Sequence, residues 1–365
     1  MAMRSRFAAT GSILGISALL LASCGSAPEE SSSSGSGAKS DHLACIVSDE
    51  GGFDDKSFNQ NSYEGVQAAK ADYGIDFKEA QSNSSDQYAS NLAQMVQSGC
   101  KTIITVGFGL ADATKASAAD NTDIHYAIVD DGSIKADNVR PIVYDTAQAA
   151  FLAGYASAAQ SKTGKVATYG GAQMPTVTIF MDGFAQGVKY YNEQKGKNVE
   201  VLGWDTETQK GTFTGDFSDQ TKGKTNTQTF LDQGADIILP VAGPVGAGTL
   251  EAVTEYNQSH ADAPAAVVWV DADGYETNEN YKGIIFTSIQ KKMKEAVEST
   301  IKDDADGKFT SDKYIGTLEN GGVVLAPFHD FDSKVSDETK SELETIKQDI
   351  ISGKITVKTE GQPTK

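Results

Sequence analysis

The sequence predicts an α/β protein made of two Rossmann-like lobes. From Leu43 onward, short apolar runs alternate with amphipathic segments, the pattern of βαβ units and mostly parallel sheets. The apolar runs are too numerous for one doubly wound sheet, and a natural break falls near residue 145. Many of these runs end in glycine, aspartate or serine. Glycine lets the backbone approach a ligand closely, and the polar side chains can accept its hydrogen bonds. Two such sheets that face each other would form a ligand clamp.

The individual elements follow from this alternation. The predicted strands are 43–48, 75–80, 101–107, 125–130, 140–144, 165–170, 198–204, 236–242, 265–271 and 283–288. The predicted helices are 56–73, 86–98, 110–119, 146–162, 176–195, 222–233, 246–258 and 289–303. Gly74 and Gly99 stand where helices commonly end in a left-handed residue.

Composition narrows the class of partner. The chain has 365 residues, 39% of them hydrophobic, and a formal net charge of −19. Such a charge argues against nucleic acid, because phosphate neutralisation needs clustered lysine and arginine. An acidic surface mainly favours solubility.

The amino-terminal segment predicts export. Arg4 and Arg6 precede an apolar run, about 13–21, that is too short to span a bilayer. The run ends in Leu-Ala-Ser-Cys, similar to the bacterial signal for cleavage before Cys24 and lipidation of its thiol. We therefore expect a signal peptide over 1–23, a flexible Ser/Gly-rich tether over 24–41, and a lipid-anchored protein on the extracytoplasmic face of the cell membrane. An ordinary signal peptide with a chance cysteine is the alternative.

Cys45 and Cys100 remain in the exported part, where an oxidising compartment permits a disulfide. Each lies near the start of a predicted strand, so neighbouring parallel strands would bring the two thiols to the same end of the sheet. Two buried free thiols are the alternative. No Cys-x-x-Cys or histidine cluster accompanies them, so we expect no metal and no cofactor.

The turn over 48–60 follows the first predicted strand and carries two glycines, several acids and two phenylalanines. It lacks G-x-G-x-x-G, and its carboxylates would repel a phosphate. No G-x-S-x-G or other nucleophile signature occurs, so an enzyme is not expected. Phe58 is either a core residue or a ring that stacks on a flat ligand, and Asn59 offers a donor and an acceptor.

Several stretches, in order along residues 43–330, resemble the basic membrane protein family, the lipid-anchored nucleoside-binding subunits of bacterial ABC importers. The longest is Asp49-Glu50-Gly51-Gly52-Phe53-Asp54-Asp55-Lys56-Ser57-Phe58-Asn59. The others are 150–156, 170–171 with Pro175, 180–187, 234–238 with 241–243, 270–271, 287–288 with Lys291, and 321–323.

The resemblance implies a type I periplasmic-binding-protein fold with a multi-crossover hinge, a purine nucleoside between the lobes, and importer permease subunits as partners. It implies that Phe58 stacks on the base. Asn59 and Asp49 match the polar contacts to the base, and Asp130 matches the acid after the fourth strand. Asp271 and Lys291 match the pair that holds the ribose, with Gly243 behind it.

One departure concerns the second stacking ring. The resemblance implies an aromatic residue near 239–243, but that stretch reads Leu-Pro-Val-Ala-Gly. The candidates to replace it are Phe180, Phe217, Trp269 and Tyr275, with weak packing by Val241 as the alternative. The polar segment 206–224 has no predicted place.

The expected lobes are 42–145 with about 273–318, and 146–272 with about 319–365. Two other functions stay open at this stage. The same fold can bind a sugar or another small polar solute, and a surface sensor or adhesin can share the anchor.

Overall fold

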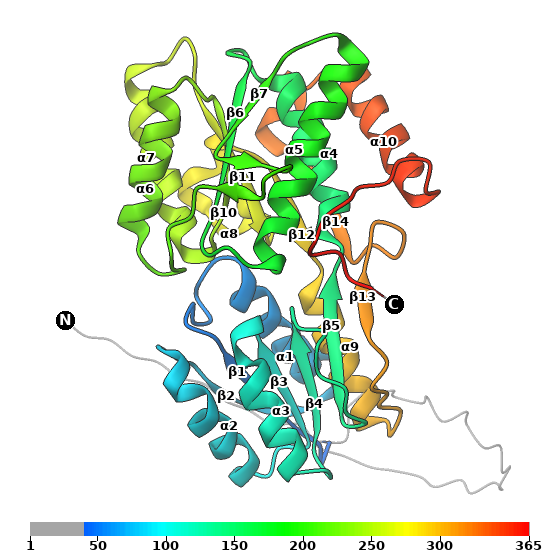
Figure 1. Ribbon diagram of the computed structural model, residues 1–365. Coiled ribbons are helices and arrows are strands. Elements are labelled where there is room, and N and C mark those ends of the chain that lie inside the picture. The colour runs from blue at the N-terminus through cyan, green and yellow to red at the C-terminus, as the bar shows by residue number, and fades with distance from the viewer. Residues whose placement is uncertain (1–39, 365) are drawn as a thin grey trace, which may run out of the picture. The chain divides into compact units, whose positions relative to one another are not determined.

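The computed structural model describes residues 40–364. The expected signal peptide, Cys24 and all but the end of the tether lie outside these residues. The described residues belong to one unit, Ala38–Lys365, which contains two six-stranded sheets (Figure 1).

The first sheet has the strand order β2-β1-β3-β4-β5-β13, and all of its pairs are parallel. Its strands are β1 (Leu43–Ser48), β2 (Asp76–Ala80), β3 (Thr102–Val106), β4 (His125–Val129), β5 (Val139–Tyr144) and β13 (Tyr314–Gly316). Its helices are α1 (Phe58–Tyr73), α2 (Tyr88–Gln97), α3 (Ala111–Asp120) and α9 (Met293–Ala305). α1 and α9 pack together, and Ile46 and Ile104 face them. Cys45 and Ile103 face α2 and α3 on the other side, so the strands are buried on both faces.

The second sheet repeats this order as β7-β6-β10-β11-β12-β14, with only β14 antiparallel. Its strands are β6 (Lys165–Gly170), β7 (Glu200–Leu202), β10 (Ile237–Val241), β11 (Ala266–Asp271), β12 (Ile285–Lys291) and β14 (Val323–Leu325). Its helices are α4 (Thr146–Gln160), α5 (Pro175–Lys195), α6 (Gln220–Asp232), α7 (Gly246–Ser259), the short α8 (Gly274–Thr277) and α10 (Asp337–Ile351). Glycines let α4 and α5 approach closely: a Cβ on Gly154 would lie 2.0 Å from the Phe184 carbonyl oxygen.

Three crossings join the sheets: β5 to α4, β12 to α9, and β13 to β14. The multi-crossover arrangement of two Rossmann-like sheets expected from the sequence is confirmed. The expected lobe boundary near residue 273 moves to 291–293, because β12 pairs with β11 in the second sheet and only α9 returns to the first. The helix expected from 289 begins at Met293 for the same reason.

Several elements escaped the sequence analysis. They are β13, β14, α10 and a hairpin of β8 (Trp204–Asp205) with β9 (Lys210–Gly211). The hairpin occupies part of the unplaced segment 206–224, and α6 begins at Gln220 in the rest. None of the described helices is long and apolar enough to cross a membrane.

Candidate functional site

The seven residues predicted to contact the ligand line one cavity of about 300 Å³. They are Asp49, Phe58, Asn59, Asp130, Gly243, Asp271 and Lys291. In both sheets the strand order reverses beside the first strand, and ligands bind at such switch points outside the carboxyl ends of the strands. The cavity is therefore built from the loops that follow these ends in both sheets.

Asp55 organises the turn between β1 and α1. Its buried carboxylate accepts hydrogen bonds from the backbone N–H groups of Ser57, Asn59 and Gln60 at 2.7–3.0 Å. These are the donors that the first turn of a helix leaves unpaired, so Asp55 caps α1 from inside the protein. Asp55 also lines the cavity, a role that was not predicted from the sequence.

Asn59 is held beside Asp49 by this cap. Its amide Nδ2 donates to Asp49 Oδ1 at 2.7 Å and to Asp55 at 3.2 Å, whereas its buried Oδ1 has no partner among the described residues. Gly107 closes over Asp49 with φ of +113°, and a Cβ there would lie 2.5 Å from Asp49 Oδ2. The Asn59 amide therefore orients the Asp49 carboxylate, which lines the cavity as an acceptor for ligand N–H groups.

Lys291 is the one basic residue of the described chain that lines the cavity. Its Nζ lies 2.5 Å from Asp130 and 3.4 Å from Asp271, and all three side chains are almost fully buried. Burial alone would lower the pKa of Lys291, but the two carboxylates outweigh burial and raise it. The ammonium is therefore fixed in its charged form between a carboxylate of each sheet.

Asp130 and Asp271 adopt φ of 66° and 67°, in the left-handed region that non-glycine residues seldom occupy. Asp130 directly follows β4, and Asp271 is the last residue of β11. Strained positions of this kind cluster at binding sites, where the surrounding contacts hold them.

Four phenylalanines line the cavity within the described part of the chain: Phe58, Phe108, Phe180 and Phe217. The Lys291 ammonium lies 5.0 Å from the centroid of Phe58 and 5.1 Å from that of Phe180. Phe217 enters from the loop before α6 and packs on Gly171, where a Cβ would lie 2.3 Å from its ring. Phe217 thus faces the cavity from the second sheet, whereas Phe58 belongs to α1 of the first.

Two of the candidates for the second ring are excluded by position. Trp269 is buried and does not line the cavity; its indole Nε1 donates to the Lys56 carbonyl at 3.2 Å. Tyr275 stacks on His329 instead, at 4.0 Å between ring centroids. Val241 does line the cavity. Neither Phe217 nor Phe180 falls in the stretch 239–243. Only the folded structure shows that both rings line the cavity.

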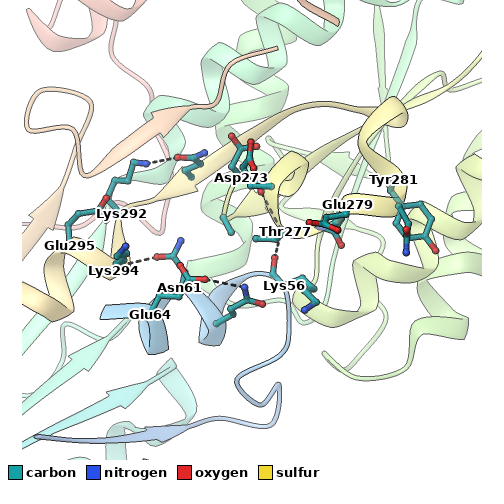
Figure 2. Close-up of a pocket in the computed structure, with 16 residues that line it drawn as sticks. Lys56, Asn61, Glu64, Asp273, Thr277, Glu279, Tyr281, Lys292, Lys294 and Glu295 are labelled. Carbon is teal, nitrogen blue, oxygen red and sulfur yellow. Dashed lines mark hydrogen bonds between the residues drawn. The ribbon is translucent and has the colours of Figure 1, made fainter. Parts of the chain in front are cut away.

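The turn between β1 and α1 also contacts the second sheet, where Lys56 and Thr277 line a separate, open polar groove (Figure 2). The Lys56 carbonyl accepts from Thr277 Oγ1 at 3.0 Å as well as from Trp269. Ser57 Oγ lies 3.0 Å from Asp271 Oδ2 and 3.1 Å from the Val270 carbonyl. These hydrogen bonds join the turn to β11 and α8. In the described structure they hold the two sheets together beside the cavity.

Cys45 and Cys100 form a disulfide, which ties β1 to the segment between α2 and β3. Of the two alternatives for these cysteines, the structure has the bonded one. The disulfide lies away from the cavity, among the residues that pack against α2 and α3.

Burial raises the pKa of the Asp49 carboxyl to about 6, against hydrogen bonds from Asn59 and Gly51 that lower it. Burial likewise raises the pKa of Asp55 to about 6. Carboxyls with raised pKa values favour folding when protonated, so their contribution is fully present below about pH 4 and is lost as pH rises through 6.

We therefore expect the Asp49→Asn variant to gain stability relative to the parent between pH 4 and pH 7. A shift of about two units corresponds to roughly 3 kcal/mol at neutral pH. Thermal unfolding across this range measures the difference between the two chains. A difference that stays constant with pH would contradict the raised pKa of Asp49.

The chain is similar to known substrate-binding proteins of ABC transporters in both sequence and fold. The family model described as ABC transporter substrate-binding protein PnrA-like matches residues 43–360. The ABC transporter nucleoside-binding protein BmpA of Lactococcus lactis is 32% identical, with 97% of this chain and 99% of that protein covered. Basic membrane protein A of Borreliella burgdorferi is 30% identical, over 84% and 85%.

Among solved structures, an ABC transporter solute-binding protein of Aeropyrum pernix superposes with a TM-score of 0.77 at 26% identity, covering 86% of this chain and 92% of that one. A solute-binding protein of Conexibacter woesei, at 20% identity and a TM-score of 0.65 with 88% and 100% covered, shares the fold. The matched family consists of proteins that bind a substrate for transport and are not enzymes.

Proposed function

Since this chain belongs to the family of PnrA-like ABC transporter substrate-binding proteins, we propose that it captures a nucleoside, with a purine base favoured, and delivers it to an ABC importer. The observation that carries the proposal is the cavity itself. It combines aromatic side chains with buried acceptors and one ammonium held between two carboxylates. A nucleoside has the matching parts: a flat base with N–H groups and a sugar with adjacent hydroxyls.

In this assignment the base lies against Phe58. Asp49 accepts hydrogen bonds from its N–H groups, and Asn59, whose Nδ2 donates to Asp49, is the second polar contact to the base. The ribose lies at the other end of the cavity, where Asp271 and Asp130 accept from its hydroxyls and Lys291 donates. Asp271 Oδ1 lies 3.4 Å from Lys291 Nζ and accepts no hydrogen bond among the described residues. Gly243, with no Cβ, allows the sugar to approach the backbone.

Charge argues against a nucleotide. Five carboxylates line the cavity, from Asp49, Glu50, Asp55, Asp130 and Asp271, against the single ammonium of Lys291. A phosphate placed there would face repulsion with little water to screen it. The lactococcal relative named as nucleoside-binding supports the same class of ligand.

The proposal includes the route to the membrane. Cys24 would carry the lipid that anchors the protein on the extracytoplasmic face, with the following residues as a tether to the described part. Permease subunits of the importer are the proposed partners. Mass spectrometry of the protein from the membrane fraction tests the anchor, because cleavage before Cys24 and acylation change the amino-terminal peptide.

We expect titration calorimetry of the purified chain to give binding with inosine, guanosine or adenosine. Free sugars and AMP should bind at least tenfold more weakly, about 1.4 kcal/mol. Asp271→Ala should cost roughly 1–3 kcal/mol of nucleoside binding, since the ribose hydroxyls lose a buried acceptor. Tighter binding of a free sugar than of any nucleoside would contradict the proposal and favour a sugar receptor. Binding to neither class would favour a surface sensor or adhesin.

A further inference from the structure

Tyr88, the first residue of α2, lines the ligand cavity and has no role in the site described so far. Its ring packs among the buried residues between the first sheet and α2, and the side chain is only 6% exposed. Gly109, on the loop after β3, lies against the other side of the ring, where a Cβ would be 3.4 Å from the hydroxyl oxygen. The ring is therefore fixed in position at the wall of the cavity.

The Tyr88 hydroxyl has no hydrogen-bond partner among the described residues. Its oxygen keeps some accessible surface, so it faces the cavity that the residue lines. Burial raises the pKa of Tyr88, and the nearby carboxylates of Asp49 and Glu50 raise it further. The hydroxyl therefore keeps its proton at neutral pH and is free to donate it to a ligand.

This hydroxyl lies at the end of the cavity assigned to the base. The loop after β3 contacts both Tyr88 and Asp49: a Cβ on Gly107 would lie 2.5 Å from Asp49 Oδ2, and one on Gly109, two residues later, would lie 3.4 Å from the Tyr88 hydroxyl. The effect of the Asp49 carboxylate on the pKa of Tyr88 agrees with this placement. A carboxylate acceptor and a hydroxyl donor thus stand near each other at the base end.

The other side-chain donors that line the cavity in the described chain are already used or are more exposed. Asn59 Nδ2 donates to two carboxylates of its own turn. The Lys291 ammonium lies between two carboxylates at the end assigned to the ribose. The remaining hydroxyls belong to Ser85, which is exposed, and Thr176, which is partly exposed. Tyr88 is therefore the buried donor that a ligand base can use.

The edge of a 6-oxopurine matches this pair of groups. Its N1–H and, in guanine, its 2-amino group are donors for a carboxylate, and the adjacent O6 is an acceptor for a hydroxyl. Adenine in the same position would place its unprotonated N1, an acceptor, against the Asp49 carboxylate. Two acceptors facing each other in a buried site repel and leave both without a hydrogen bond.

We propose that Tyr88 is a specificity-determining residue of this protein, whose hydroxyl donates to O6 of the base and selects guanosine and inosine over adenosine. Asp49 accepts from N1–H of the same base. The proposal rests on the proposed function, because it requires a nucleoside whose base lies at the Asp49 end of the cavity.

The test is titration calorimetry of the full-length chain with guanosine, inosine, adenosine and purine riboside, which has no substituent at C6. We expect the parent protein to bind guanosine and inosine at least about tenfold more tightly than the other two. Tyr88→Phe should weaken guanosine and inosine about tenfold, the value of one hydrogen bond, and change adenosine and purine riboside less than about twofold. The preference for 6-oxopurines should therefore largely disappear in the variant.

Thermal unfolding separates a binding role of Tyr88 from a structural one. Tyr88→Phe removes a hydroxyl without a partner and keeps the ring, so it should unfold at the temperature of the parent or above. Tyr126→Phe is the matched control, because Tyr126 lies in the same buried cluster but does not line the cavity, and its hydroxyl is hydrogen-bonded to Ser117 at 2.9 Å. The control should unfold at a lower temperature and leave all four affinities unchanged.

Three results would overturn the proposal: a parent protein that binds adenosine as tightly as inosine, unchanged affinities in Tyr88→Phe, or a loss in that variant that is as large for adenosine as for guanosine. Each of these results requires that nucleosides bind, so each leaves the proposed function standing. A parent protein that binds none of the four compounds would contradict the proposed function together with this inference.

Discussion

Replacing Lys291 by methionine should destabilise the protein by about 3–5 kcal/mol, the usual cost of removing one partner from a buried ion pair. Methionine keeps most of the side-chain volume, so the loss comes from charge. The carboxylates of Asp130 and Asp271 would remain buried without their counter-ion. Lys291 holds together Asp130 from the first sheet and Asp271 from the second, and all three line the ligand cavity. The variant should therefore also lose nucleoside binding. Chemical denaturation gives the stability and calorimetry gives the binding.

Lys292→Met is the matched control for this prediction. Lys292 is the next residue, is partly exposed, and donates to Gln290 at 2.7 Å, with no carboxylate partner among the described residues. It should unfold within about 0.5 kcal/mol of the parent, as surface substitutions do. If Lys291→Met were equally mild, the charge of Lys291 would not be needed to hold the two carboxylates.

The parts of the fold that the sequence predicted are those with a strong local pattern. Strands such as β3 and β10 are buried on both faces and read as short continuous apolar runs. The elements that escaped it are short or depend on distant partners. β13 and β14 have three residues each, and their pairing with β5 and β12 is set by crossings that no local pattern encodes.

The site shows the same division. The stretch from Asp49 to Asn59 is continuous in sequence, so its chemistry could be interpreted before the structure. The role of Asp55 as an internal cap depends on which way its carboxylate points, which spacing alone does not specify. The central ion group joins Asp130, which follows β4, to Lys291 at the end of β12, 161 residues later. The resemblance paired Lys291 with Asp271, whereas in the structure its nearer partner is Asp130.

The second stacking ring is the other feature that the sequence left open, and we expect Phe217 to supply it. Phe180 is almost fully buried, so little of its ring is available to a base. Phe217 is only partly buried, lies on a loop of the second sheet, and lines the cavity that Phe58 lines from the first. A base between the two rings would be held on both faces.

Phe217→Ala should therefore weaken nucleoside binding by roughly 1–3 kcal/mol, as the loss of an aromatic stacking partner does, and Phe58→Ala should cost a similar amount. The control is Phe213→Ala on the same loop, because Phe213 packs against Gly170 and Trp204 and does not line the cavity. Phe213→Ala should leave affinity unchanged, and circular dichroism and thermal unfolding check that the loop stays folded. Calorimetry of all three variants with the tightest nucleoside measures the effect. A larger loss in Phe180→Ala than in Phe217→Ala would instead assign the second face of the base to Phe180, because truncation costs most at the ring that contacts the ligand.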